Sequence, residues 1–332
     1  MKKIIDSLWL KNFNFEEKTF QIFEYQKVNN HIYKRFCDAL QISDIASIDE
    51  IPLLPIQAFK DAFILTENSL LKTQDSKLIF HSSGTSGMSR SKHLVSNPEI
   101  YRQSIIQGIN HFYDLDEYVI LAYTPGYNDN PYSSLVWMLN ALIEQEPSGL
   151  SRFLDLGTSI AQVDIDEINS ARKKVMIFGA AFGLLDLIEM GVPNLPNDSI
   201  ILETGGMKTF QREMTKQVLH QQLADGFGVD KKQIHSEYGM TELLSQAYSC
   251  GSLWFDAVPW MRVSIHNPQN PMEIQPAGTE GLIGVIDLAN INSCSFILTG
   301  DKGIQNNEGQ FQVLGRWNPI NLRGCNFLID QD

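Results

Sequence analysis

The chain has 332 residues, enough for one large α/β unit with a substantial buried core. Hydrophobic residues make up 43% and charged residues 20%, which is typical of a globular protein and excludes a largely disordered one. The 39 acidic residues exceed the 26 basic ones, and the net charge of −13 argues against a surface that follows nucleic-acid phosphates.

The N-terminus, "MKKIIDSLWLKNFNFEEK", turns acidic and polar after a few apolar residues and does not resemble a secretory signal. The longest apolar runs fall short of the roughly 20 residues that span a bilayer. We therefore expect a cytoplasmic protein. None of the four cysteines forms a CxxC pair, and we expect Cys37 and Cys294 to be reduced, buried thiols.

The first segment, residues 1–75, is predicted to be mainly helical. Asn14 is a suitable N-cap for an amphipathic helical region over 15–40, with an interruption near Asn29 and Asn30. The following "DEIPLLPIQAFKDAFIL" carries two prolines three residues apart, which exclude a helix across them and favour an extended segment.

The second segment, residues 76–250, alternates short β-rich runs with helical runs. Strands are expected at 77–83, 92–96, 118–124, 173–179 and 199–206, and helices at 98–115, 133–145, 180–191 and 209–228, the last ending at Gly226 or Gly228. This alternation predicts an α/β fold with a largely parallel sheet.

The third segment, residues 251–332, is β-rich. Its predicted strands lie in "WMRVSIHNP", "GLIGVIDLAN", "CSFILTGDKGI" and "GQFQVLGRWNPI", separated by Gly, Asn and Pro turns. With no internal repeat and no long linker, the three segments are expected to form one unit over 1–332.

A first candidate motif is "HSSGTSGMSRSK", residues 81–92. Its small residues expose backbone N–H groups and add hydroxyl donors, which suits a polyphosphate. It is not a Walker A loop, because no Gly-Lys-Ser/Thr follows and a strand comes next. Taken alone, a flexible Ser/Gly hairpin remains the alternative.

A second motif is "HSEYGMTELLSQAY", residues 235–248. A strand ending at Tyr238-Gly239 would place an aromatic ring, the Thr241 hydroxyl and the Glu242 carboxylate at the carboxyl end of a sheet, where α/β folds bind ligands. The ring could stack on a base, and the carboxylate could hold Mg²⁺ against phosphates. The alternative is a helix start capped by Thr241 or Glu242.

Two further motifs lie near the C-terminus. In "LTGDKG", Gly300-Asp301 by itself indicates a turn, whereas the functional alternative is a carboxylate that accepts both ribose hydroxyls. In "LGRWNPINLRGCN", Arg316 and Arg323 could contact ribose or phosphate, or could be solvated surface residues.

In this order the four motifs resemble the core signature of the adenylate-forming superfamily, which includes acyl- and aryl-CoA ligases, adenylation domains and luciferases. The motifs that support this resemblance are "SSGTSG", "YGMTE", "TGD" and "GR". Within the superfamily the chain resembles the LuxE-type acyl-protein synthetases of bacterial luminescence, which are related to phenylacetate-CoA ligases. This likeness rests on "IPLLPIQAFK", "SSGTSGMSRSKH", "SSLVWM", "ETGGMK", "YGMTELLSQAY" and "LRGCN".

The resemblance implies an enzyme that uses ATP and Mg²⁺ to activate a carboxylic acid, with a fatty acid as the expected class. Phosphate contacts would come from Ser82, Ser83, Gly84, Thr85, Ser86, Gly87 and Arg90, the last standing where most superfamily members have Lys. The adenine site would include Gly205, Gly206, Tyr238 and Gly239. Thr241 would contact the α-phosphate, Glu242 the Mg²⁺, and Asp301, with Arg316 nearby, the ribose.

We expect a departure from most of the superfamily after Arg316, where the resemblance predicts no C-terminal lid of the kind that carries an adenylation lysine and a CoA-binding face. The LuxE-type family is short in the same way and uses a cysteine near its C-terminus as acyl acceptor. Cys325 occupies that place, and the nearby Arg323 would favour its thiolate. A buried structural thiol is the alternative for Cys325.

The acid-binding pocket is expected around the part of the chain that lines it in the family. These residues are Tyr123, Tyr127, Ser133, Ser134, Trp137 and Met138, and ordinary core packing is an equal alternative for the last two. The acyl acceptor could be Cys325, CoA or a carrier protein, and a partner reductase could receive the acyl group. A non-catalytic nucleotide-binding relative is the remaining alternative.

Overall fold

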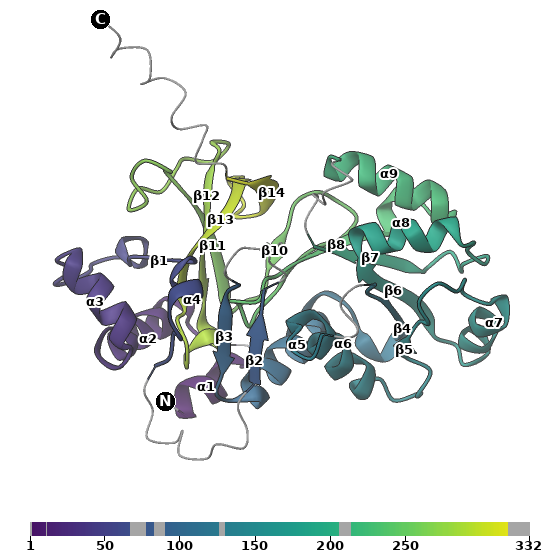
Figure 1. Cartoon of the computed structure of the whole chain (residues 1–332), viewed down its shortest axis with the longest axis horizontal. Helices are drawn as coiled ribbons and strands as arrows, with labels where there is room; N and C mark the ends of the chain where they lie inside the picture. The colour runs from purple at the N-terminus through teal and green to yellow at the C-terminus, as the bar shows by residue number, and fades with distance from the viewer. Residues whose placement is uncertain are drawn as a thin grey trace, which may run out of the picture.

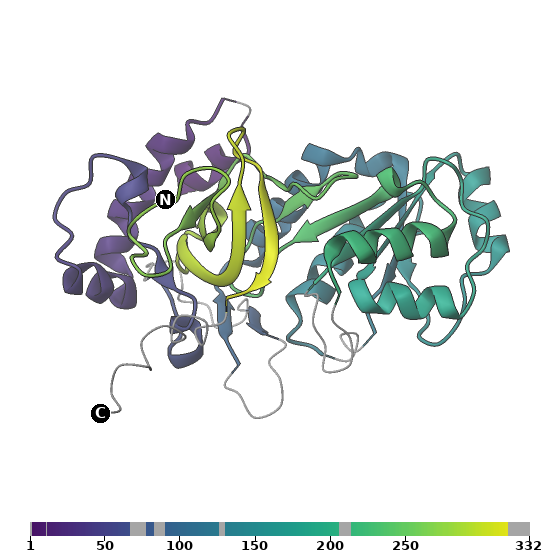
Figure 2. The ribbon, with the colours of Figure 1, turned by 90° about the horizontal axis from the view of Figure 1, so that it is seen from above.

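The computed structural model describes residues 2–10, 12–66, 78–82, 90–125, 130–205 and 214–317. Two large sheets lie side by side, with a two-stranded hairpin next to both (Figures 1 and 2). The N-terminal helices pack beside the smaller of these sheets, and the remaining α-helices of the described residues surround the larger one (Figure 1).

The N-terminal helices follow the predicted pattern. They are α1 (Lys2–Leu8), α2 (Phe15–Asn29), α3 (His31–Ala39) and α4 (Ala58–Asp61), with a 3₁₀ helix at η1 (Ile48–Glu50). The Asn14 side chain accepts a hydrogen bond from the backbone of Glu17 at 3.1 Å, and Asn30 does the same for Tyr33 at 3.0 Å. The predicted cap and the predicted interruption are therefore both confirmed, since asparagine side chains satisfy the first N–H groups of a helix.

A five-stranded sheet carries the C-terminal β-rich segment. Its strands are β1 (Leu54–Pro55), β11 (Met261–His266), β12 (Gly281–Asp287), β13 (Phe296–Gln305) and β14 (Phe311–Arg316). β11, β12, β13 and β14 pair antiparallel, and β1 adds in parallel to β13. The extended segment expected around the two prolines is thus an edge strand, a place where a residue without an N–H is tolerated.

The turn interpretation of Gly300-Asp301 is wrong. Both residues lie inside β13, which continues to Gln305, and Asp301 is the direct partner of Arg316 on β14. Pairing with two neighbouring strands outweighs the local preference of glycine and aspartate for turns, because each strand residue gains hydrogen bonds that a turn would forgo.

The larger sheet has seven strands in the order β10-β9-β8-β7-β6-β4-β5. They are β4 (Tyr118–Tyr123), β5 (Arg152–Phe153), β6 (Lys174–Ala180), β7 (Ile200–Thr204), β8 (Ile234–Tyr238), β9 (Ala247–Ser249) and β10 (Asp256–Ala257). The strands β5, β4, β6, β7 and β8 run parallel, whereas β9 and β10 are antiparallel. The predicted largely parallel sheet is confirmed.

Helices cover both faces of this sheet (Figure 1). On one face lie α5 (Pro98–Phe112) and α6 (Ser134–Gln145), and on the other α7 (Gln162–Ser170), α8 (Ala181–Glu189) and α9 (Lys216–Phe227). The 3₁₀ helices here are η3 (Leu115–Glu117) and η4 (Lys231–Gln233), and η5 (Leu288–Asn290) follows β12. Alternate β6 side chains enter two separate cores, with Phe178 in one and Ile177 in the other.

The last predicted helix begins later than expected. Met214 and Thr215 precede α9, and the Thr215 hydroxyl caps it by accepting a hydrogen bond from Val218 N at 3.3 Å. The expected start at residue 209 is therefore wrong, because a side-chain cap fixes the first turn. Its end is as predicted, with Gly228 in the left-handed conformation (φ +65°) that glycine adopts without strain.

The hairpin of β2 (Leu78–His81) and β3 (Lys92–Val95) forms a separate two-stranded sheet. Its strands pair antiparallel, so that His81 lies opposite Lys92. Both strands were predicted, and their pairing brings the two ends of the Ser/Thr/Gly-rich motif together.

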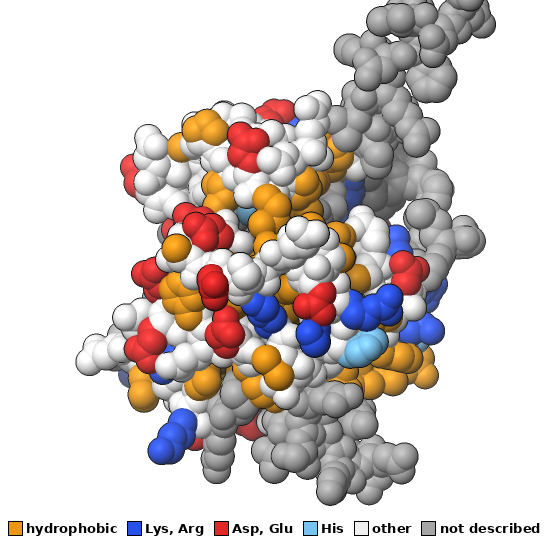
Figure 3. Space-filling view, turned by 90° about the vertical axis from the view of Figure 1, so that its left-hand side faces the viewer, with side chains coloured by type: hydrophobic (Ala, Val, Ile, Leu, Met, Phe, Trp, Pro, Cys, Tyr) orange, Lys and Arg blue, Asp and Glu red, His pale blue; other side chains and the backbone are white. Residues whose placement is uncertain are grey.

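The surface over the N-terminal helices mixes acidic, basic and apolar side chains (Figure 3). Among the described residues, no helix is both long and apolar enough to cross a membrane.

Candidate active site

The hairpin closes through two serines. Ser82 N donates to Ser91 O at 3.1 Å, and Ser91 N donates to the Ser82 hydroxyl at 3.0 Å. Arg90, beside this closure, is exposed. The predicted phosphate contacts Ser83, Gly84, Thr85, Ser86 and Gly87 lie outside the described residues.

Glu242 lies in the turn after β8 and reaches the hairpin. Its side chain is almost fully buried and accepts a hydrogen bond from the Ser91 hydroxyl. Burial raises the pKa of this carboxyl, while Ser91 and the positive charge of Arg316 oppose the rise. Thr241 and Glu242 start no helix, since the next regular element is the strand β9, and the helix-cap alternative is therefore wrong.

Asp301, Arg316 and Tyr238 form the second part of the site. Arg316 Nε lies 3.0 Å from Asp301 Oδ1, and the Tyr238 hydroxyl donates to Asp301 Oδ2 at 3.1 Å. Burial raises the pKa of Asp301, and these two partners counteract it. A carboxylate fixed from both sides in this way presents its oxygens in a defined direction.

The Tyr238 ring is held by two phenylalanines at near-perpendicular angles. Its centroid lies 6.1 Å from that of Phe255 and 5.4 Å from that of Phe311. At the next residue, Gly239, a Cβ would meet the Glu237 carboxyl, so a larger residue here would require the Glu237 side chain to shift. Gly205 directly follows β7 and has φ +102°, and Gly206 lies outside the described residues.

The structure therefore brings together residues far apart in the sequence: the hairpin end at Ser91, the turn at Glu242, and the pair Asp301–Arg316. The charges of Asp301 and Arg316 act on Glu242, which places all three carboxyl and guanidinium groups in one neighbourhood. A site of this kind offers two carboxylates, one cation and the hydroxyl groups of Ser91 and Tyr238.

Sequence reasoning did not single out three residues that shape this neighbourhood: Ser91, His93 and Asn290. His93 is fully buried on β3 and contacts Thr241 O and Asn290 Oδ1 at 2.8 and 3.1 Å. The sequence pattern could have indicated that His93 is buried, since it lies two residues before the apolar Val95 and therefore on the same, inward side of a predicted strand.

A pair of glutamates lies at the carboxyl edge of the larger sheet. Burial opposes ionisation of Glu203, but the ammonium group of Lys216, 2.5 Å away, and other hydrogen-bond donors outweigh it and lower its pKa. On the adjacent strand, burial and the charge of Glu203 raise the pKa of Glu237 to about 7, although the Thr204 hydroxyl donates to it.

The residues expected to line the acid pocket are not gathered in one place. Tyr123 packs in the core under α8 and α9, whereas Met138 and Trp137 pack on the opposite face of the sheet. The Trp137 ring stacks on Tyr101 with a centroid distance of 4.9 Å, and the Ser133 side chain caps α6. Ser134 is the first residue of α6, and Tyr127 lies outside the described residues.

The cysteines divide by environment. Cys37 and Cys294 are buried, and burial raises their pKa values to about 11 and about 12, which confirms them as inert thiols. Cys250 is exposed and lies 3.6 Å from the Tyr113 hydroxyl. Cys325 and Arg323 lie outside the described residues.

No group of three or more His, Cys, Asp or Glu side chains in the described parts of the chain could cage a metal ion. The carboxylates of the candidate site still suit Mg²⁺, which commonly takes one or two protein carboxylates and completes its shell with water and substrate phosphates. Glu242, with the Ser91 hydroxyl beside it, is a fitting single carboxylate.

Comparison with known proteins supplies the family. The model of the LuxE acyl-protein synthetase family matches residues 155–332, more than half of the chain. The chain belongs to this family. A curated relative from Vibrio harveyi, "Long-chain-fatty-acid--luciferin-component ligase", is 21% identical over 93% of this chain and 85% of its own length.

The fold is that of the adenylate-forming enzymes, as the sequence predicted. The solved structure of 2-hydroxyisobutyryl-CoA ligase in complex with an acyl-AMP and CoA matches with a TM-score of 0.61 at 11% identity, covering 95% of this chain and 69% of that one. ATP-bound MatB from Rhodopseudomonas palustris matches with a TM-score of 0.52 at 16% identity over 72% of this chain. The chain spans about half the length of MatB, 47%.

Proposed function

We propose that this protein is an ATP-dependent acyl-protein synthetase. It activates a carboxylic acid as an acyl-adenylate with release of pyrophosphate, and then transfers the acyl group to a thiol. The proposal rests above all on one observation: Ser91, Glu242 and the Asp301–Arg316 pair, from separate motifs, share one neighbourhood. The family and the ATP-bound structural relative support the use of ATP.

Each part of the nucleotide has a proposed partner. The hairpin loop, including Thr85 and Arg90, contacts the phosphates, and Thr241 contacts the α-phosphate. Tyr238, Gly205, Gly206 and Gly239 form the adenine site. Asp301, oriented by Arg316 and Tyr238, accepts the ribose hydroxyls. When bound, Mg²⁺ would be held by Glu242 and would neutralise phosphate charge.

The first step needs positioning and charge neutralisation rather than a base. A carboxylate is already ionised at neutral pH, so its oxygen can attack the α-phosphorus without losing a proton. Its difficulty is repulsion from the anionic phosphates, which the hairpin donors and Arg316 reduce. The bond from the α-phosphorus to the bridging oxygen breaks, and pyrophosphate leaves.

In the second step a thiolate attacks the acyl carbon and AMP leaves. We propose Cys325 as this thiol, on the strength of its place in the family motif "LRGCN". A fatty acid is the first acid to test, because the curated relative is named as a long-chain fatty acid ligase. A reductase or carrier protein is the proposed recipient, and the cytoplasm, where ATP is available, the proposed location. The chain acts as one unit over 1–332.

ATP–pyrophosphate exchange tests the first step. Purified protein is incubated with ATP, Mg²⁺, labelled pyrophosphate and a panel of fatty and aromatic acids. We expect acid-dependent incorporation of label into ATP. Absence of exchange with every acid would contradict the enzyme proposal and favour a nucleotide-binding protein.

The acyl acceptor is tested with labelled acid and two matched variants. Cys325→Ser should abolish hydroxylamine-labile label on the protein while exchange continues. Cys250→Ser removes an exposed thiol elsewhere and should leave both unchanged. Label that persists in Cys325→Ser refutes self-acylation, and acyl-CoA or acyl-carrier formation would instead identify that acceptor.

A further inference from the structure

We infer that His93 is a positioning residue that fixes the Thr241–Glu242 turn against the phosphate hairpin. The inference rests on the proposed function and names a residue of that same site. His93 lies on β3, directly after the hairpin closure, and its ring is completely buried. Through this ring the hairpin contacts the backbone of the turn, at the carbonyl oxygen of Thr241.

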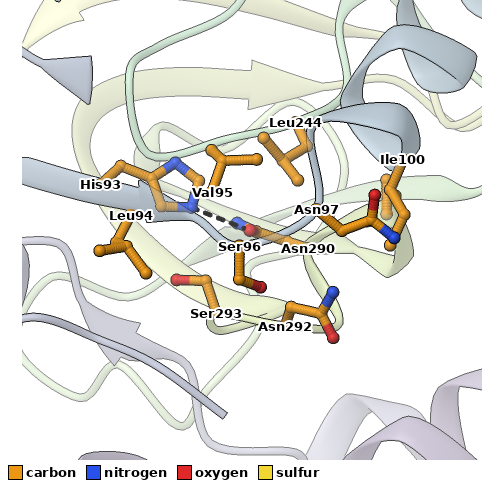
Figure 4. Close-up of a pocket in the computed structure, with 11 residues that line it drawn as sticks. His93, Leu94, Val95, Ser96, Asn97, Ile100, Leu244, Asn290, Asn292 and Ser293 are labelled. Carbon is orange, nitrogen blue, oxygen red and sulfur yellow. Dashed lines mark hydrogen bonds between the residues drawn. The ribbon is translucent and has the colours of Figure 1, made fainter. Parts of the chain in front are cut away.

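Three polar contacts connect this ring, Asn290 and the turn. His93 Nδ1 lies 2.8 Å from Thr241 O, and His93 Nε2 lies 3.1 Å from Asn290 Oδ1. Asn290 Nδ2 in turn donates to Glu242 O at 2.7 Å. The carbonyls of two consecutive residues, Thr241 and Glu242, are thus held by side chains from other elements, as Figure 4 shows for the His93–Asn290 contact.

The proton of the ring belongs to the Thr241 contact. Burial lowers the pKa of His93 to about 4, so the ring is neutral at neutral pH and has a single N–H. A backbone carbonyl can only accept, so we assign the N–H to Nδ1, at the shorter of the two distances. Asn290 keeps its own donor for Glu242 O, so its Oδ1 faces the unprotonated Nε2 of His93. Both of these atoms are acceptors, and their 3.1 Å approach is a contact without a hydrogen bond.

The surroundings leave the ring little freedom. Phe59 packs edge-on against it with a centroid distance of 5.6 Å. On the Asn290 side lies a small cavity with about 10 Å³ of room for the centre of a water molecule, close to what one water needs. The buried Ser96 hydroxyl lines this cavity (Figure 4) and has no hydrogen-bond partner within the described residues.

This arrangement links two parts of the proposed site by neutral contacts. Ser91, two residues before His93, donates to the Glu242 carboxyl, while His93 holds the carbonyl just before it. The turn is therefore tied to β3 at both its backbone and its side chain. A loss of the backbone tie should let Glu242 move relative to the hairpin and should weaken the site for Mg²⁺–ATP rather than for the acid.

Four proteins test the inference: wild type, His93→Leu, His93→Asn and His266→Leu. Leucine fills similar space without a donor, whereas the asparagine amide can place an N–H where Nδ1 was. His266 is a matched control, since it is also buried and contacts Pro271 O and the Ser264 hydroxyl at 2.7 and 2.8 Å, away from the site. Two concentrations are measured in pyrophosphate exchange: the Mg²⁺–ATP concentration and the acid concentration that each give half the maximal rate. The melting temperature, Tm, is measured separately.

We expect His93→Leu to raise half-saturating Mg²⁺–ATP about tenfold, the effect of losing one buried hydrogen bond, with the acid value nearly unchanged. His93→Asn should recover most of the loss, and His266→Leu should lower Tm without that kinetic effect. Unchanged Mg²⁺–ATP saturation in a folded His93→Leu, or an equal loss in His266→Leu, overturns the inference. Wild-type protein without exchange overturns the proposed function and this inference with it.

Discussion

The two sheets that meet at the site use carboxylates in opposite ways. The five-stranded sheet places Asp301 of β13 beside Arg316 of the edge strand β14, and in this edge pair the Arg316 side chain is 72% exposed. The seven-stranded sheet encloses Glu203 and Glu237, both buried on neighbouring strands. The first pair reaches solvent through Arg316, and the second lies in the protein interior.

The difference shows what each sheet can contribute. Asp301 is buried, but its partner Arg316 reaches solvent, so the pair is suited to contact a ligand that comes and goes. A buried carboxyl is stable only when it is paired with a cation or when it stays protonated. Glu203 is paired with Lys216, whereas the raised pKa of Glu237 favours its protonated form. Substitutions in the edge pair should alter ligand binding, whereas substitutions in the buried pair should alter stability.

The largest effect is expected at the cation of the buried pair. Lys216→Met leaves Glu203 buried without its ammonium partner and should lower the free energy of unfolding by about 3 kcal/mol. Urea unfolding measures this. Lys174→Met, at a partly exposed pair with Glu117, is the control and should cost under about 1 kcal/mol. Equal losses in both variants would remove the distinction between the buried and the exposed pairs.

The second effect concerns Asp301, the carboxylate of the edge pair. Asp301→Asn keeps the size of the side chain but removes the charge that Arg316 and the proposed ribose contact require. We expect kcat/KM for ATP in pyrophosphate exchange to fall about 100-fold, as for a lost charged hydrogen bond, with little change in Tm. Asp49→Asn, at an exposed pair with Arg262, is the matched control. Full activity in Asp301→Asn would exclude the ribose role.

The third effect is a pH dependence with opposite signs at the two buried glutamates. The pKa of Glu237 is about 7 in the folded protein and near 4.5 when unfolded, so its contribution is present at low pH and lost as pH rises through 7. Lowering the pH from 8 to 5 should therefore stabilise wild type by about 2 kcal/mol relative to Glu237→Gln.

Glu203→Gln should behave in the opposite sense. The folded-state pKa of Glu203 lies below its usual value, so wild type should lose stability relative to this variant as the pH falls. Urea unfolding at several pH values measures both slopes. If the stability of wild type relative to the two variants changed with pH in the same direction, the two carboxyls would not differ as described.

Local sequence patterns predicted those parts of the fold and site that depend on nearby residues. Alternation and helix caps predicted most strands and helices, and Asn14 and Asn30 act as expected. The strand before Glu242 ends at Tyr238 as predicted, because strand ends and adjacent turns are set by a few residues.

The remaining features depend on partners distant in the chain. β1 pairs with β13, and Asp301 lies in a strand rather than a turn because β14 pairs beside it. The role of His93 could not be predicted, since its partners Thr241 and Asn290 come from other elements. Glu237 would be an ordinary strand residue without the burial and the neighbouring Glu203 that raise its pKa.

The smallest effect is expected from Arg316→Lys, which keeps the charge of the edge pair but removes the planar guanidinium. Arg316 contacts Asp301 through Nε, and in the proposed nucleotide site the rest of its guanidinium would point toward an anionic ligand. Because the side chain is largely exposed, the free energy of unfolding should change by less than about 0.5 kcal/mol.

The same variant should raise KM for ATP roughly fivefold, since an ammonium cannot make two parallel hydrogen bonds. Steady-state exchange and urea unfolding of one preparation measure both values. A loss of stability without a change in KM would make Arg316 a structural partner of Asp301 rather than a ligand contact. The edge pair would then resemble the buried pair Glu203–Lys216, and the contrast between the two sheets would rest on Asp301 alone.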